Sequence, residues 1–210
     1  MKTQTPRSQA ERSAATTERL LASARRLFAE HGYAATSLSD VVVDAGLTKG
    51  AIYHHFAGKE DVFREVFERE QRALAHAVGE AAWSERDPWD GIRAGWRAFL
   101  EAASDPAVQR ITLLDAPAAL GWQTAREIAS SYTVSMLETG LARAMRLGRI
   151  QPAPEAALAR LLYAAMCEAA MAIARAPGDP LTAIEMSEAV EVLLSGLELH
   201  DARSASEPSP

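Results

Sequence analysis

The sequence is poor in the features that mark secreted, membrane-spanning and disulfide-stabilised proteins. Its 210 residues include one cysteine, Cys167, so neither an internal disulfide nor a cysteine metal cluster can form. The most apolar run, residues 161–174, is shorter than a bilayer-spanning helix and contains Glu168. The N-terminus lacks the apolar segment of a secretory signal. We therefore expect a cytoplasmic protein with no membrane partner.

Signatures of common enzymes and of metal sites are also missing. The chain has no nucleophile elbow, no HExxH motif, no Rossmann glycine pattern and no paired-carboxylate metal motif. Residues 46–50, GLTKG, lack the spacing of a phosphate-binding loop. His54 and His55 are neighbours about 100° apart around a helix, so they cannot converge on one ion without help. We expect no enzymatic activity, no cofactor and no metal.

Charge is distributed unevenly along the chain. The net charge is −6, yet residues 1–59 hold eight Lys or Arg against five Asp or Glu. The remainder is correspondingly acidic. A basic N-terminal segment, residues 1–59, and an acidic remainder, residues 60–210, suggest two parts of the chain with different partners.

What the sequence does contain is one helical pattern after another. No segment shows sustained alternation of apolar and polar residues, and proline and glycine fall at regular breaks. We predict an all-α fold of about nine helices, with a break at 115–121 and disordered tails at 1–15 and 201–210. The predicted helices cover 17–31, 38–45, 49–56, 59–83, 88–103, 106–114, 122–147, 155–176 and 181–199.

Residues 37–59 have the pattern of a helix-turn-helix. Ser37 can cap one short helix, Gly46 breaks the chain, and Thr48 can cap a second. Outward-facing groups of the second helix, Lys49 and Tyr53 among them, could then reach base edges or phosphates in a major groove.

The order and spacing of these motifs resemble one family. The segment ERLLASARRLFAEHGYAATSLSDVVVDAGLTKGAIYHHFAGKEDVFREVFE is similar to the DNA-binding domain of tetracycline-repressor (TetR) family regulators. It covers about a quarter of the chain. The resemblance implies a homodimer that binds a palindromic double-stranded DNA operator, acts most often as a repressor, and is released by a small molecule.

We expect a DNA-binding domain at 16–62 and a ligand-binding and dimerisation domain at 63–200. The boundary falls inside a helix, so no flexible linker separates the two. The expected DNA contacts are Thr36, Ser37, Ser39, Thr48, Lys49, Gly50, Tyr53, His54 and Lys59.

The rear half is rich in tryptophan and methionine, which suits an apolar pocket for an aromatic or lipophilic effector. Asp115 lies among aliphatic residues, and two readings are open: a ligand contact or a helix N-cap. The expected ligand contacts are Trp96, Phe99, Leu100, Ile111, Leu114, Asp115, Trp122, Arg126, Tyr132, Met136, Met166 and Met171.

The last two predicted helices carry small and apolar residues on more than one face. Pairing both with their copies would form a four-helix bundle about a two-fold axis. The expected interface residues are Leu158, Leu162, Ala165, Ala169, Val190, Leu194 and Leu197.

Two other functions remain open at this point. One is a helical DNA-architectural protein without an effector, although the apolar rear half argues against it. The other is a helical enzyme that uses the rear pocket. Release of DNA by a ligand would separate the regulator from the first, and turnover of a bound ligand would support the second.

Overall fold

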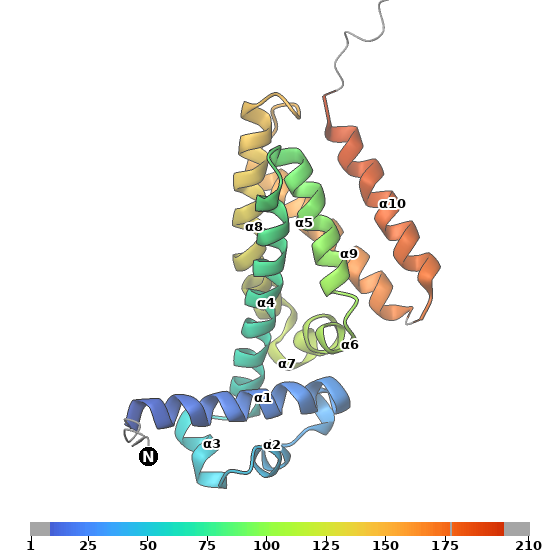
Figure 1. Cartoon of the computed structure of the whole chain (residues 1–210). Coiled ribbons are helices and arrows are strands. Elements are labelled where there is room, and N and C mark those ends of the chain that lie inside the picture. Colours follow the sequence, from blue (N-terminus) through green and yellow to red (C-terminus); the bar gives the residue numbers. More distant parts are fainter. Residues whose placement is uncertain (1–8, 177, 200–210) are drawn as a thin grey trace, which may run out of the picture. The chain divides into compact units, whose positions relative to one another are not determined.

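The computed structural model describes residues 9–176 and 178–199, and it confirms the all-α prediction (Figure 1). Its helices are α1 (Gln9–Ala35), α2 (Leu38–Asp44), α3 (Lys49–His55), α4 (Lys59–Ser84), α5 (Pro88–Ala102), α6 (Pro106–Val108), the π-helix η1 (Gln109–Asp115), α7 (Ala116–Leu120), α8 (Trp122–Arg146), α9 (Glu155–Arg175) and α10 (Pro180–Leu197).

Each predicted helix has a counterpart, and two expectations about irregular segments are wrong. Residues 9–15, expected to be disordered, form the start of α1. Residues 115–121, expected to be a break, hold the end of η1 and the whole of α7 before Gly121 turns the chain with a φ of 80°. Proline is tolerated here because it occupies the first turn of α7. The tail predicted at 201–210 and residues 1–8 lie outside the described residues.

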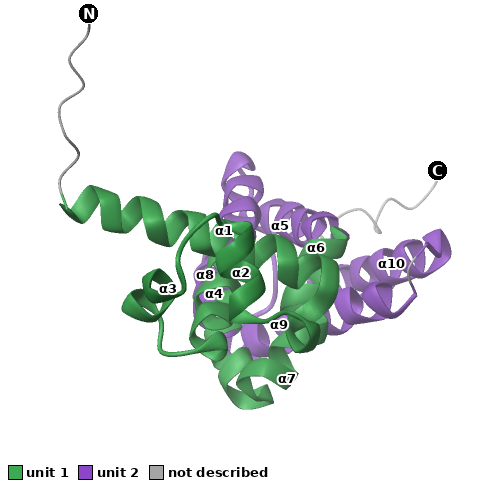
Figure 2. Ribbon diagram, turned by 90° about the horizontal axis from the view of Figure 1, so that it is seen from below, with its two compact units in different colours: residues 1–73, 105–129 green, residues 74–104, 130–210 purple. Residues whose placement is uncertain are grey.

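The chain divides into two compact units, and the division does not follow the predicted domain boundary (Figure 2). Unit 1 holds residues 1–73 and 105–129, and unit 2 holds residues 74–104 and 130–210. Segments remote in sequence therefore join the N-terminal helices. Helices α4 and α8 each contribute residues to both units.

The core of unit 1 explains this division. Phe28 of α1 and Phe63 of α4 are fully buried, with ring centroids 5.1 Å apart, and Tyr33 lies 4.9 Å from Phe63. Ile111 of η1 and Leu120 of α7 are buried in the same cluster. The apolar residues after 105 thus cover the N-terminal helices as part of one core.

Two ion pairs join α1 to α4 beside that core. Arg25 donates to both carboxylate oxygens of Glu70, at 2.6 and 3.1 Å. Arg69 forms a two-pronged pair with Glu18, at 2.7 Å for each bond, which lowers the pKa of Glu18. Fork-shaped pairs of this kind set the register between two helices as well as their attraction.

Unit 2 is built from the end of α4 with α5, most of α8, α9 and α10. Asp87 caps α5 by accepting from the backbone N–H groups of Trp89 and Asp90, and Trp89 is fully buried. Gly91 lets α5 approach α4 closely, since a Cβ there would lie 2.6 Å from the carbonyl oxygen of Ala82. Close helix packing at this point leaves no room for a side chain.

Helix α9 is long and apolar enough to cross a membrane by length and composition alone. The core helix of a globular protein passes the same test, and α9 buries seven of its residues within the chain. Its neighbours in unit 2 are α5 and α10.

Candidate functional site

Helices α2 and α3 form the expected helix-turn-helix. The Ser37 hydroxyl accepts from the N–H of Asp40, and the Asp40 carboxylate accepts from the N–H of Ser37, which completes a capping box. The Ser37 hydroxyl and backbone N–H hold the pKa of Asp40 below its usual range. Gly46 turns the chain with a φ of 61°, and Leu47 N–H donates to the Val42 carbonyl at 3.0 Å.

Polar contacts from α1 hold this turn in place, and sequence reasoning did not find them. Ser23 is buried and donates to the Asp44 carboxylate at 2.6 Å and to the Val41 carbonyl at 3.1 Å. Arg26 pairs with the same carboxylate. Arg19 donates to the carbonyl of Ala45 at 2.6 Å and so supplies the end of α2 with a cation. The available signal was the helical spacing of Arg19, Ser23 and Arg26 along one side of α1.

Helix α3 is divided into a buried anchor and an exposed face. Ile52 is fully buried in the core of unit 1. Lys49, Gly50 and His54 are exposed, and the side chain of Tyr53 is 55% exposed. A large aromatic side chain held open beside a lysine suits a partner surface better than a protein core. Four of the expected DNA contacts therefore lie together on one accessible face.

The other expected DNA contacts differ in whether their side-chain hydroxyls are free or engaged within the protein. Ser39 is exposed, and Ser37 is exposed with its hydroxyl engaged in the capping box. Thr48 is exposed at the N-cap position of α3, but the expected side-chain capping bond is not formed.

Thr36 and Lys59 have structural roles that the sequence analysis did not anticipate. Thr36 is only 2% exposed and donates to the carbonyls of Leu27 and Gly32, so the expectation of a side-chain contact to DNA is wrong. Lys59 Nζ donates to the Tyr33 carbonyl at 2.9 Å and lies 4.3 Å from the centre of the Tyr33 ring. Its ammonium group therefore binds a backbone carbonyl in the last turn of α1.

Asp115 belongs to unit 1 and does not line the cavity of unit 2, and its carboxylate serves another helix than the one it precedes. It stands at the N-cap position of α7, but its side chain makes no capping bond there and instead accepts from the backbone N–H of Tyr33 at 2.7 Å. Arg110 Nε lies 3.6 Å from the same oxygen. Gly32 has a φ of 82°, and a Cβ there would lie 2.8 Å from the Arg110 guanidinium. The Arg110–Asp115 pair therefore packs against the kink of α1.

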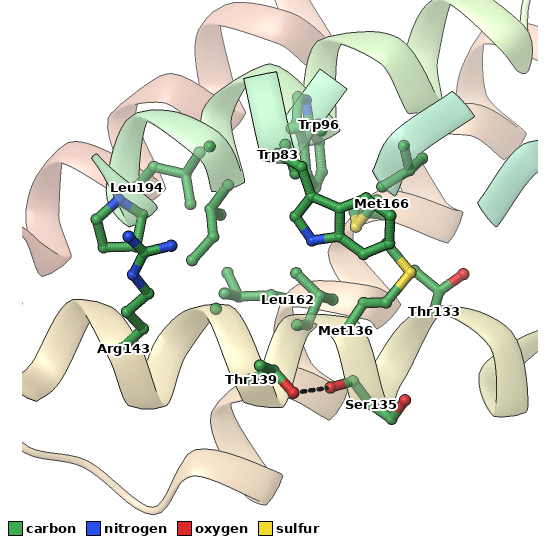
Figure 3. Close-up of a pocket in the computed structure, with 18 residues that line it drawn as sticks. Trp83, Trp96, Thr133, Ser135, Met136, Thr139, Arg143, Leu162, Met166 and Leu194 are labelled. Atoms are coloured by element: carbon green, nitrogen blue, oxygen red, sulfur yellow. Dashed lines mark hydrogen bonds between the residues drawn. The ribbon is translucent and has the colours of Figure 1, made fainter. Parts of the chain in front are cut away.

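Unit 2 contains an apolar cavity of about 220 Å³ (Figure 3). Its lining comes from α4, α5, α8, α9 and α10, and the residues are Val78, Ala82, Trp83, Pro88, Gly91, Ile92, Gly95, Trp96, Thr133, Ser135, Met136, Leu137, Thr139, Gly140, Arg143, Leu162, Met166 and Leu194. Apolar walls with a few placed polar groups are typical of small-molecule sites.

Only part of the expected ligand set lines this cavity. Trp96, Met136 and Met166 do. Phe99 and Leu100 are buried elsewhere, and neither Tyr132 nor Met171 reaches the lining. The remaining five residues, Ile111, Leu114, Asp115, Trp122 and Arg126, belong to unit 1, so their assignment to this cavity is wrong.

The lining residues that sequence reasoning missed lie mainly on α5 and α8. Gly91 and Gly95 are one turn apart on α5, and Gly140 lies on α8 against Ile92. Glycines spaced by four within a helix indicate a face where another backbone comes close. That spacing was the available signal.

The expected interface residues of α9 and α10 face inward more than predicted. Leu162 and Leu194 are buried and line the cavity, and Ala169 and Val190 are buried too. Leu158, Ala165 and Leu197 are half-buried. The large apolar side chains that these helices do expose are Leu161, Leu181, Ile184, Val192 and Leu193.

Two family models match the chain. Residues 20–66 match the N-terminal model of the bacterial regulatory proteins of the tetR family. Residues 89–197 match a tetracyclin repressor-like C-terminal domain. The first covers the helix-turn-helix. The second covers α8, α9 and α10 completely, and all of α5 except its first residue, Pro88.

Solved structures and curated relatives agree with these models. A TetR-family transcriptional regulator from Pectobacterium atrosepticum is 34% identical, with a TM-score of 0.81 over 92% of this chain and 99% of that one. SmeT, the repressor of the Stenotrophomonas maltophilia efflux pump SmeDEF, in its complex with triclosan is 25% identical, with a TM-score of 0.69 over 93% and 99%.

Among curated proteins, the transposon Tn10 TetC protein of Escherichia coli is 27% identical over 124 residues. That match spans 59% of this chain and 62% of the relative's length. Taken with the helix-turn-helix and the two matched models, these likenesses show that the chain belongs to the TetR family of bacterial transcriptional regulators.

Proposed function

We propose that this protein is a cytoplasmic repressor that binds a palindromic DNA operator as a homodimer and leaves it when a small molecule fills the cavity of unit 2. The observation that carries the proposal is α3, which buries Ile52 and exposes Lys49, Tyr53 and His54. A short helix anchored by one apolar residue and open on its polar side suits the major groove.

DNA contact is tested by substitutions on the exposed face of α3. Lys49→Ala should weaken operator binding and lower the salt slope of log K by roughly one unit, because one phosphate contact is lost. Tyr53→Phe removes only the hydroxyl and should weaken binding without unfolding the protein. Arg146→Ala, a cation in the last turn of α8, is the control and should leave the slope unchanged. Wild-type affinity and slope for both α3 variants would refute this docking.

The homodimer is proposed to form through the exposed apolar residues of α9 and α10. Val192 is 72% exposed and Leu161 is 69% exposed. Several exposed apolar side chains of this size on two helices favour a protein partner over water. A second copy is the simplest partner, because a two-fold axis would also pair the two α3 helices with a palindrome.

Helix α4 is the proposed route from the effector to DNA. Its 26 residues begin beside α3 in sequence and end at the cavity residues Ala82 and Trp83. A ligand that favours one position of α4 need only prefer it by a few kcal/mol to shift the dimer away from its DNA-binding form. Spin labels at Arg64, one in each protomer, should change their separation on ligand binding while the dimer stays intact. An unchanged separation during DNA release would exclude this route.

A further inference from the structure

The cavity of unit 2 indicates the chemistry of its ligand, because few polar groups line it and its charge is of one sign. Among the described residues that line it, Arg143 is the one charged side chain, and no carboxylate faces it. A cationic molecule would therefore meet a like charge and no counter-charge.

Arg143 is available for a ligand. It is exposed, and within the described part of the chain its side chain forms no hydrogen bond or ion pair. Arg146 lies in the same last turn of α8 but does not line the cavity. Both arginines complement the helix dipole, so only the position of Arg143 at the cavity distinguishes the two.

The opposite end of the cavity is aromatic and polarisable. Figure 3 shows the Trp83 indole beside the Met136 thioether, away from Arg143. Trp83 is 78% exposed, so it lies at the cavity mouth with most of its ring in solvent. Met136 and Arg143 are seven residues apart on α8, which is about 10 Å along a helix. Methionine sulfur and indole rings both favour contact with a flat aromatic molecule.

The remaining polar groups of the lining are uncharged: the hydroxyls of Thr133, Ser135 and Thr139 and the indoles of Trp83 and Trp96. Thr139 Oγ1 donates to the Ser135 carbonyl at 2.9 Å, so its proton is already committed (Figure 3). Trp96 Nε1 is buried and has no hydrogen-bond partner among the described residues, but it does not open into the cavity space. The guanidinium of Arg143 is the strongest available donor at this cavity, and it matches a carboxylate in shape and charge.

We propose that the effector is a small, flat aromatic molecule with a single anionic group, bound with its ring against Trp83 and Met136 and its anion at Arg143. This inference rests on the proposed function, since it names the ligand class of the same cavity. An apolar cavity of about 150 Å³ admits benzene. The 220 Å³ here accommodates a molecule of one or two rings with a carboxylate.

Three probes with one ring system test the proposal: 2-naphthoate, 2-naphthamide and 2-naphthylmethylammonium. Calorimetric titration of the full-length protein should give 2-naphthoate the highest affinity and the ammonium probe the lowest. Arg143→Gln should weaken 2-naphthoate about tenfold and leave 2-naphthamide unchanged. Arg146→Gln, the matched control, should change neither. Near-UV circular dichroism checks that the variants remain folded.

Several outcomes would overturn the inference. These are equal or tighter binding of the ammonium probe, an unchanged 2-naphthoate affinity in Arg143→Gln, an equal loss in Arg146→Gln, or no binding of 2-naphthoate.

An operator-binding assay separates this failure from that of the proposed function. If neutral or cationic compounds release DNA and 2-naphthoate does not bind, the proposed repressor function is supported and the proposed ligand class is refuted. If 2-naphthoate binds in a manner that depends on Arg143 but the protein has no operator, the proposed ligand class is supported and the proposed repressor function is refuted.

Discussion

Replacing Asp115 tests whether the segment after residue 105 holds the kink of α1. In Asp115→Ala, the Tyr33 N–H loses a charged acceptor at 2.7 Å and Arg110 loses its nearest carboxylate at 3.6 Å. A hydrogen bond to a charged group contributes about 1.5–3 kcal/mol. The ion pair adds little, because the Arg110 side chain is 42% exposed. We expect a loss of about 2 kcal/mol, or roughly 4–8 °C in Tm for a chain of this size.

Urea unfolding followed by circular dichroism measures this loss. Asp115→Asn is the matched variant, because its amide oxygen can still accept from Tyr33 while the charge facing Arg110 is removed. It should lose clearly less stability than Asp115→Ala. Neither substitution should change the affinity of a ligand in unit 2, because Asp115 does not line the cavity. An Asp115→Ala protein of wild-type stability with weakened ligand binding would refute this reasoning.

Three further results are expected. Gly91→Ala should lower Tm by several degrees, because the new Cβ would lie 2.6 Å from a carbonyl oxygen of α4; an unchanged Tm would exclude that close approach. Val192→Glu should yield monomers in analytical ultracentrifugation, while Leu147→Glu, also exposed, should stay dimeric; an intact Val192→Glu dimer would move the interface elsewhere. Burial works to raise the pKa of Asp87, but bonds from two backbone N–H groups and the charge of Arg149 hold it below its ordinary value. The stability from Asp87 is therefore present above about pH 4 and is lost as pH falls through the folded pKa of Asp87. In Asp87→Asn, Tm should therefore decrease less steeply as pH is lowered below about 4 than it does in the wild type. An identical dependence of Tm on pH in the two proteins would contradict this.

The helix-turn-helix was predictable because its determinants are local. A serine cap, a glycine turn and apolar residues at helical spacing fix α2 and α3 over some twenty residues. The exposed face of α3 follows once Ile52 is assigned to the core. Thr36 was misassigned because its neighbours in space, Leu27 and Gly32, lie a full turn or more earlier in the chain.

The cavity was less predictable because it depends on how distant helices pack. Sequence reasoning grouped Asp115 and Trp122 with Trp96 by proximity along the chain, yet the first two belong to unit 1. Periodicity shows that α9 and α10 are apolar on several faces but does not say which face meets the rest of the chain. Leu162 and Leu194 were therefore assigned to a dimer interface, although they line the cavity.

The most direct test of the central claim is operator binding with and without a ligand that raises Tm. Fluorescence anisotropy of a labelled fragment from upstream of the gene, at fixed salt, would follow release in the wild type and in Met136→Trp, whose larger side chain fills the cavity. We predict that saturating ligand releases DNA from the wild type, while Met136→Trp binds DNA and does not respond. Wild-type protein that keeps full operator affinity with the cavity occupied would contradict the account.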